Sequence, residues 1–212
     1  MSGSLNLGTD PAKMYLREVC VADNTGSTTD LAEISGQIIS DTTAGGGGTA
    51  TYTYPLVKTG AGTLILSHAN NTYSGATYVK EGTLLVNGTL ATPSSTAVAV
   101  NPDYSAVTVM NGGTLGGTGT INRVVAFQTG STLAVNAASA NPLTVGGAVT
   151  LSGLPSITVV GGTLSASSYT ILTATSITGT FNAATAPEGY KISYTATTVT
   201  LAKPGGPVLI VQ

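Results

Sequence analysis

Side chains that could support acid–base chemistry are few in this sequence, and most lie near the N-terminus. Asp and Glu together number nine in 212 residues. Hydrolysis or cleavage of a polysaccharide needs paired carboxylates, or an acidic metal cluster with a basic residue. Only Asp30 and Glu33 are close neighbours in the sequence. We therefore predict no catalytic residue, no cofactor and no metal; a weak Ca²⁺ site formed by Asp23, Asp30 and Asp41 at one corner is the alternative.

The chain has one histidine and one cysteine. No Gly-x-Ser-x-Gly sequence accompanies His68, so a serine triad is not predicted. We interpret His68 as a surface residue in a loop beside Asn70 and Asn71. Cys20 lies in an apolar run, which predicts a small buried core residue. A reactive thiol or an intermolecular bridge is the alternative, since one cysteine cannot form an intrachain disulfide.

Charge and hydropathy exclude several classes of function. Charged residues make up 8% of the chain, the net charge is −2, and the seven Lys and Arg are scattered, so no nucleic-acid partner is predicted. Mean hydropathy is +0.31. No apolar run approaches the roughly 18 residues of a membrane helix, so this segment is not expected to insert into a membrane. Residues 1–4 lack the basic and apolar regions of an export signal.

The elements expected to carry these residues are short strands joined by turns. Between residues 56 and 87, three apolar runs rich in Leu, Ile, Val, Thr and Tyr alternate with Gly, Asn and Ser. None shows the three-four spacing of a helix. Related glycine-led units recur downstream, mostly at steps of about 17 to 20 residues with one longer step near residue 100 and one shorter near 155, which is typical of a solenoid. These units begin at Gly82, Gly113, Gly130, Gly147, Gly162 and Gly179.

In a solenoid, each coil buries its inward side chains against the coils before and after it. We predict that residues 1–165 form a β-solenoid, and that roughly ten coils stacked about 4.8 Å apart would give a rod of about 50 Å. A surface loop is expected at 42–53 and an insertion at about 91–106; one or two helical turns at 13–21 are an alternative. The predicted inward side chains are Leu64, Leu66, Val79, Leu84, Val86, Val107, Val109, Leu115, Ile121, Leu133, Val135, Leu143, Val145, Leu151, Val159, Leu164 and Ile171.

The C-terminal part changes character. Residues 166–202 alternate more regularly and contain the turn sequence Pro187-Glu188-Gly189, which predicts hairpin strands that cap the solenoid. Residues 203–212 read as a Pro-Gly-Gly linker and an apolar strand. That strand could pack on its own cap or add to the edge of a neighbouring subunit. The predicted subunit contacts are Pro207, Val208, Leu209, Ile210 and Val211.

Residues 56–87 closely resemble the autotransporter passenger-associated repeat, L-x-K-x-G-x-G-T-L-x-L-S-x-x-N-x-Y-x-G-x-T-x-V-x-x-G-T-L-x-V. Either Asn70 or Asn71 supplies the asparagine before Tyr73. The other matching residues are Leu56, Lys58, Gly60, Gly62, Thr63, Leu64, Leu66, Ser67, Gly75, Thr77, Val79, Gly82, Thr83, Leu84 and Val86. The resemblance implies an all-β, right-handed parallel β-helix with a C-terminal hairpin cap, displayed outside a bacterial cell.

The expected function is therefore a non-enzymatic, extracellular structural or adhesive module of a bacterial surface protein. Its expected partners are host or surface glycans, other surface proteins, and copies of itself joined head-to-tail in fibres. The alternative is a carbohydrate-active enzyme, a polysaccharide lyase or hydrolase, on the same scaffold. An ice- or mineral-binding face of Thr-x-Thr rows, such as 49–53 or 118–120, is disfavoured because those rows do not recur at the coil period.

Overall fold

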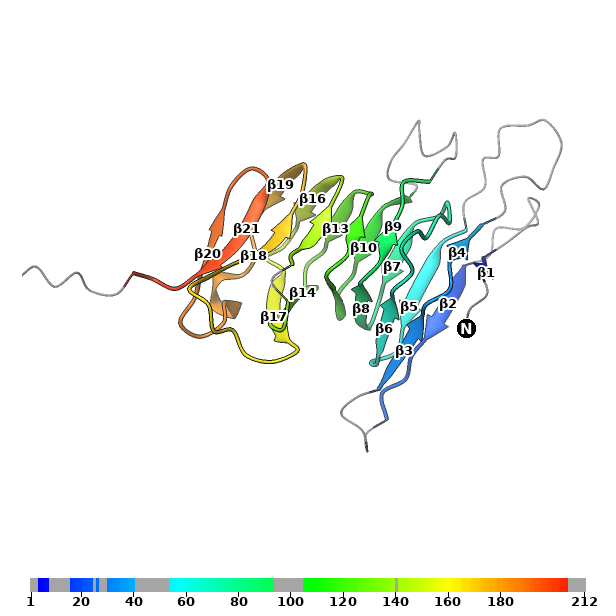
Figure 1. The fold of residues 1–212 in the computed structure, drawn as a ribbon, viewed down its shortest axis with the longest axis horizontal. Helices are drawn as coiled ribbons and strands as arrows, with labels where there is room; N and C mark the ends of the chain where they lie inside the picture. Colours follow the sequence, from blue (N-terminus) through cyan, green and yellow to red (C-terminus); the bar gives the residue numbers. More distant parts are fainter. Residues whose placement is uncertain are drawn as a thin grey trace, which may run out of the picture.

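The computed structural model describes residues 4–7, 16–24, 26, 30–40, 54–93, 105–139 and 141–205. The loop predicted at 42–53, most of the insertion predicted at 91–106, and Pro207–Val211 lie outside these residues. Within them the chain winds through three parallel sheets that run side by side along a rod (Figure 1). The fold is a right-handed parallel β-helix, as predicted, and the described residues contain no helix long and apolar enough to cross a membrane.

The coils between β7 and β18 each contribute one short strand to each of the three sheets in turn. Sheet I contains β2 (Arg17–Cys20), β5 (Leu56–Thr59), β7 (Thr77–Val79), β10 (Val107–Val109), β13 (Val125–Phe127), β16 (Ala148–Leu151) and β19 (Ser176–Gly179). Sheet II contains β3 (Leu31–Ile34), β6 (Thr63–Leu66), β8 (Gly82–Val86), β11 (Gly113–Gly116), β14 (Thr132–Asn136) and β17 (Ser156–Val160). Sheet III contains β9 (Thr89–Leu90), β12 (Thr120–Ile121), β15 (Leu143–Val145), β18 (Ser168–Thr173), β21 (Thr198–Ala202) and β20 (Lys191–Tyr194). A further parallel pair joins β1 (Leu5–Asn6) to β4 (Ile38–Ile39).

In the described part of the chain, sheet I has seven strands, so the expectation of roughly ten coils was wrong. From the second coil onward, its strands begin at residues 56, 77, 107, 125, 148 and 176. Most coils are therefore longer than the 17 to 20 residues suggested by the glycine-led units. The reason is that the corners between strands differ in length, while the strands themselves stay in register.

In-register stacking builds a continuous apolar column inside the rod. One inward row runs through Leu64, Leu84, Leu115 and Leu133, each paired with the next strand and each fully buried. All but two of the predicted inward residues are buried; Val159 and Leu164 are half-buried. Because every coil repeats the same inward positions, each side chain finds its partner directly above and below.

The corner between sheets I and II requires unusual backbone conformations. Gly112 and Gly130 occupy equivalent positions in successive coils and have φ of 83° and 76°. In the next coil, the register puts Leu154 at this position, with φ of 56° and 57% of its side chain exposed. A left-handed conformation costs a branched residue about 1–2 kcal/mol more than glycine. Leu154 is thus a local strain point that the two preceding coils avoid.

Antiparallel strands close the C-terminal end of the rod. β21 pairs with β18, β20 pairs with β21, and both pairings are antiparallel. A 3₁₀ turn, η2 (Ala183–Thr185), lies over β17, where the amide of Ile157 donates to Thr185 Oγ1 at 2.9 Å. The amide of Ile177 in β19 donates to the carbonyl of Ala196 at 2.8 Å. All three sheets are therefore covered at this end.

Candidate functional site

The acidic residues proposed for chemistry do not converge in the described part of the chain. Glu18 accepts a hydrogen bond from Thr59 Oγ1 and Glu33 accepts one from Ser67 Oγ, so each ties the first coil to the second. Asp30 accepts from the backbone amide of Asn24. Asp41, the third member of the suggested Ca²⁺ site, lies outside the described residues. No group of three His, Cys, Asp or Glu able to hold a metal occurs among those described.

The single histidine and cysteine occupy places that differ in exposure. His68 is half-buried, and its Nδ1 accepts a hydrogen bond from the amide of Asn70 at 3.1 Å, which fits a loop residue. Cys20 is exposed, so the prediction of a buried core cysteine was wrong. Strand alternation explains the error: Val19 takes the inward position of β2, and its neighbour must point outward.

Among the residues that the structure describes, two cations are buried inside the rod, and Lys58 is the first of them. It pairs with Val19 on one side and Val79 on the other, in an inward row, and is fully buried. Its Nζ donates to the carbonyls of Thr59 at 2.7 Å, Gly60 at 2.6 Å and Glu81 at 3.1 Å. Burial lowers its pKa, although the charges of Cys20 and Glu81 oppose that change. The ammonium thus joins the corner that ends β5 to the corner one coil further on.

Arg123 is the second buried cation, with 3% of its surface exposed. Its guanidinium donates to the carbonyls of Tyr73 at 2.8 Å, Gly75 at 2.9 Å and Ala91 at 3.1 Å, and reaches that of Ser105 at 3.5 Å. Burial lowers its pKa, but an arginine side chain stays charged in proteins. One side chain therefore ties together both ends of the segment 92–104 and the coil that precedes it.

An aromatic ring completes the surroundings of Arg123. The guanidinium carbon lies 4.4 Å from the centroid of the Tyr73 ring, a cation–π distance. The hydroxyl of Tyr73 is 2.6 Å from Thr77 Oγ1, and both side chains are fully buried. The resemblance places Tyr73 and Lys58 in the repeat but does not explain why a tyrosine and a lysine occupy these positions. The structure shows that they anchor consecutive coils to one another.

Asn71 replaces a missing strand. The second coil has no strand in sheet III, where a single bridge joins Asn71 to Leu90. The buried Asn71 amide accepts from the amide of Ile38 at 2.9 Å and donates to the carbonyls of His68 and Thr89, both at 3.1 Å. Its side chain thus connects the coils on either side as a peptide group would. The sequence left Asn70 and Asn71 as alternatives, and Asn71 is the buried one.

Threonines form two rows on the outside of the rod. The first lies on sheet II, with each residue directly paired with the next: Thr63, Thr83, Thr114, Thr132 and Ser156. The second lies on sheet III: Thr89, Thr120, Thr144, Thr173 and Thr198. These rows hold one residue per coil and run across the strands, so they differ from the Thr-x-Thr rows within a strand that were considered for an ice- or mineral-binding face. Unequal corners separate the members of each row in the sequence, and strand register aligns them.

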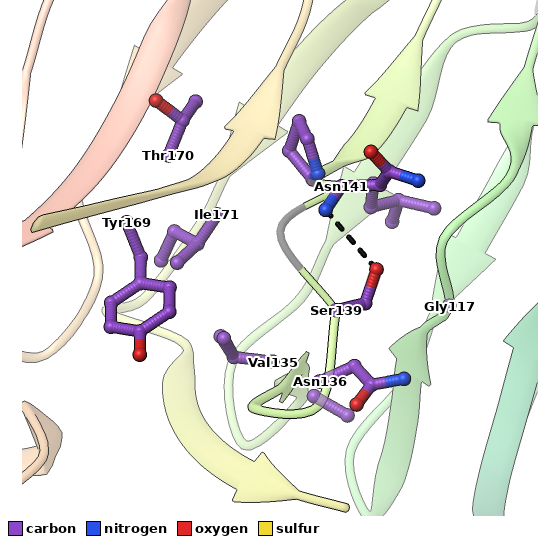
Figure 2. Close-up of a pocket in the computed structure, with 11 residues that line it drawn as sticks. Gly117, Val135, Asn136, Ser139, Asn141, Tyr169, Thr170 and Ile171 are labelled. Carbon is purple, nitrogen blue, oxygen red and sulfur yellow. Dashed lines mark hydrogen bonds between the residues drawn. The ribbon is translucent and has the colours of Figure 1, made fainter. Parts of the chain in front are cut away.

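A shallow hollow lies at the corner between sheets II and III. Figure 2 shows Tyr169 and Ile171 on one side and Ser139 and Asn141 on the other. Ser139 Oγ accepts from the amide of Asn141 at 3.1 Å. The enclosed space fits about one water molecule. A hollow of this size suits contact with a surface rather than enclosure of a substrate.

Comparison with known proteins agrees with this geometry. A family model described as the passenger-associated-transport-repeat matches residues 56–86. The chain is also 43% identical, over 76 residues, to an extracellular serine protease of Serratia marcescens. The match covers 36% of this chain and 6% of that protein, so the chain spans a small part of its relative's length. Residues 56–86, which supply Lys58, Asn71 and Tyr73 to the interior of the rod, are thus an autotransporter passenger repeat in a parallel β-helix.

Proposed function

We propose that this chain is a non-enzymatic structural and adhesive module of a protein displayed outside a bacterial cell. The observation that carries the proposal is the unbroken parallel stacking from β2 to β19, with buried Lys58 and Arg123 bonded across the corners. Interactions that span several coils resist bending and local opening. The name of the Serratia relative supports an extracellular location.

The two rows of half-buried threonines support the adhesive role. Hydroxyls about 4.8 Å apart along a rigid sheet present donors and acceptors at fixed spacing, which suits glycans or the polar surfaces of other proteins. A glycan array probed with the whole chain tests this role. The variant Thr114→Val/Thr132→Val is the matched comparison, because it changes one row and leaves the core side chains in place. Equal glycan binding by the unchanged chain and the variant would show that the threonine row on sheet II is not the binding surface.

The distribution of exposed apolar side chains supports association between copies. Among the described residues, five large apolar side chains are exposed, and all lie near the two ends of the rod: Leu5, Leu16, Leu31, Leu154 and Tyr194. Exposed apolar groups at both ends favour head-to-tail contact. Light scattering as a function of concentration tests this association. A mass that stays at the monomer value of 20.9 kDa at all concentrations would contradict it.

The non-enzymatic assignment is tested separately. Incubation of the chain with a panel of polysaccharides and with an unfolded protein substrate is expected to release no reducing ends, no unsaturated products and no peptides. Turnover of any one of these, retained through purification and lost on heating, would overturn the assignment. A rod observed by electron microscopy after negative staining, without turnover, would agree with it.

A further inference from the structure

Among the described residues, the apolar column is less covered over β3, near its N-terminal end, than at its C-terminal end, and a contact between copies at β3 would rest on the proposed self-association. In the first coil, Ala32 and Ile34 are only partly buried. The residues paired with them in the second coil, Leu64 and Leu66, are fully buried. At the other end Phe181, 2% exposed, closes the column, and its ring packs edge-on against Phe127 at 5.9 Å.

At this end, one edge of β3 faces β6 and the other faces away from it. The carbonyls of Asp30 and Ile34 accept from Thr63 and Ser67 in the second coil. Successive peptide groups of a strand point to opposite sides, so those of Leu31 and Glu33 point away from β6. In the residues that the structure describes, no strand pairs with β3 on that side. Leu31 stands beside this edge with 58% of its side chain exposed.

One segment of the same sequence fits this edge. We propose that Pro207–Val211 of one copy adds as a strand to the free edge of β3 in a second copy, and so joins rods head-to-tail. Residues 208–211 are four consecutive apolar residues, equal in number to the four residues of β3. Side chains that alternate along this added strand would cover Ala32 and Ile34 on the inner face and lie beside Leu31 on the outer face.

The geometry favours another copy over the segment's own rod. β21, which ends at Ala202, lies at the capped end of the rod, opposite β3 (Figure 1). Sheet II places β3 five strand spacings from β17, about 24 Å at roughly 4.8 Å each. Val208 is three residues beyond Gly205 and reaches about 11 Å when fully extended. The strands at the capped end are already covered by Ala196, η2 and β21, which leaves the outer edge of β20 as the competing site.

Two variants of the full chain separate donor from acceptor. Deletion of residues 207–212 removes the donor strand, and Leu31→Asp places a charge beside the acceptor edge. Each alone is expected to scatter light as a monomer at concentrations where the unchanged chain assembles. A mixture of the two is expected to form one-to-one dimers of about twice the monomer mass, because one partner supplies the intact edge and the other the strand.

Matched controls keep the result interpretable. Thr150→Asp introduces the same charge at an exposed position of β16, which is not an edge strand, and is expected to assemble like the unchanged chain. Glu33→Pro removes an amide that points away from β6, so it should block addition while circular dichroism stays unchanged.

Three outcomes would overturn the inference. The first is that Leu31→Asp and Glu33→Pro assemble to the same size as the unchanged chain. Self-association would then hold, but the contact would lie elsewhere, and the outer edge of β20 would be the next site to test. The second is a mixture that stays monomeric although the unchanged chain assembles. The third is a monomeric unchanged chain, which contradicts the proposed self-association as well.

Discussion

Replacing Arg123 with methionine tests whether the buried cation holds the coils together. Methionine preserves much of the side-chain volume but removes every donor. The change leaves the carbonyls of Tyr73, Gly75 and Ala91, bonded at 2.8 to 3.1 Å, without their partner. Each buried group left unsatisfied costs about 1–3 kcal/mol. Relief from burying a lone cation offsets part of that sum, so we expect a net loss of about 3–5 kcal/mol.

Urea unfolding followed by circular dichroism measures this loss as a fall in the midpoint at constant slope. Lys203→Met is the matched control. Lys203 also donates to a carbonyl, that of Ser165 at 3.0 Å, but it is exposed, so its removal should change stability by less than about 0.5 kcal/mol. A loss below about 1 kcal/mol for Arg123→Met would refute the reasoning, since it would mean that water or rearranged backbone satisfies the three carbonyls.

Three further changes probe other parts of the rod. Burial lowers the pKa of Lys58, so the unfolded chain holds the ammonium proton more tightly than the folded chain. The free energy of unfolding should therefore rise with pH just below about 10.5 in the unchanged protein. Lys58→Met should lose this rise, and urea midpoints measured across this pH range test the difference. Leu154→Gly should raise the unfolding free energy by about 0.5–1 kcal/mol, whereas Gly112→Leu, at an equivalent corner with open space, should lower it; equal signs would contradict the strain argument. Asn71→Leu should accelerate hydrogen exchange at the Ile38 amide, and unchanged exchange would disprove the bridging role.

The strand content, the inward rows and the capped end could be predicted from the sequence because they depend on local patterns. Alternation within three to five residues sets which side chains point inward. Leu64 and Leu84 follow this rule, and both are fully buried. The same rule applied strictly would have placed Lys58 inward and Cys20 outward. Both were missed because residue type was given more weight than position in the strand.

The candidate site could not be predicted to the same degree. Arg123 bonds to carbonyls 18 to 50 residues before it, and no local pattern marks such partners. Asn71 acts between two coils, on Ile38 and Thr89, that are distant in the sequence. The Thr rows have the same origin, because the residues that form a row are separated by corners of unequal length.

The sequence by itself determined the kind of coil: short Thr- and Leu-rich strands, glycine corners and a passenger-type repeat at 56–86. These are properties of a few adjacent residues, so they can be predicted without knowing which coils lie above and below. Only the tertiary structure decided the number of coils, the register that aligns the threonines, and the burial of Lys58 and Arg123 against backbone carbonyls. The physical reason is that each coil is completed by the next one, and the contacts between coils are set by stacking rather than by sequence separation.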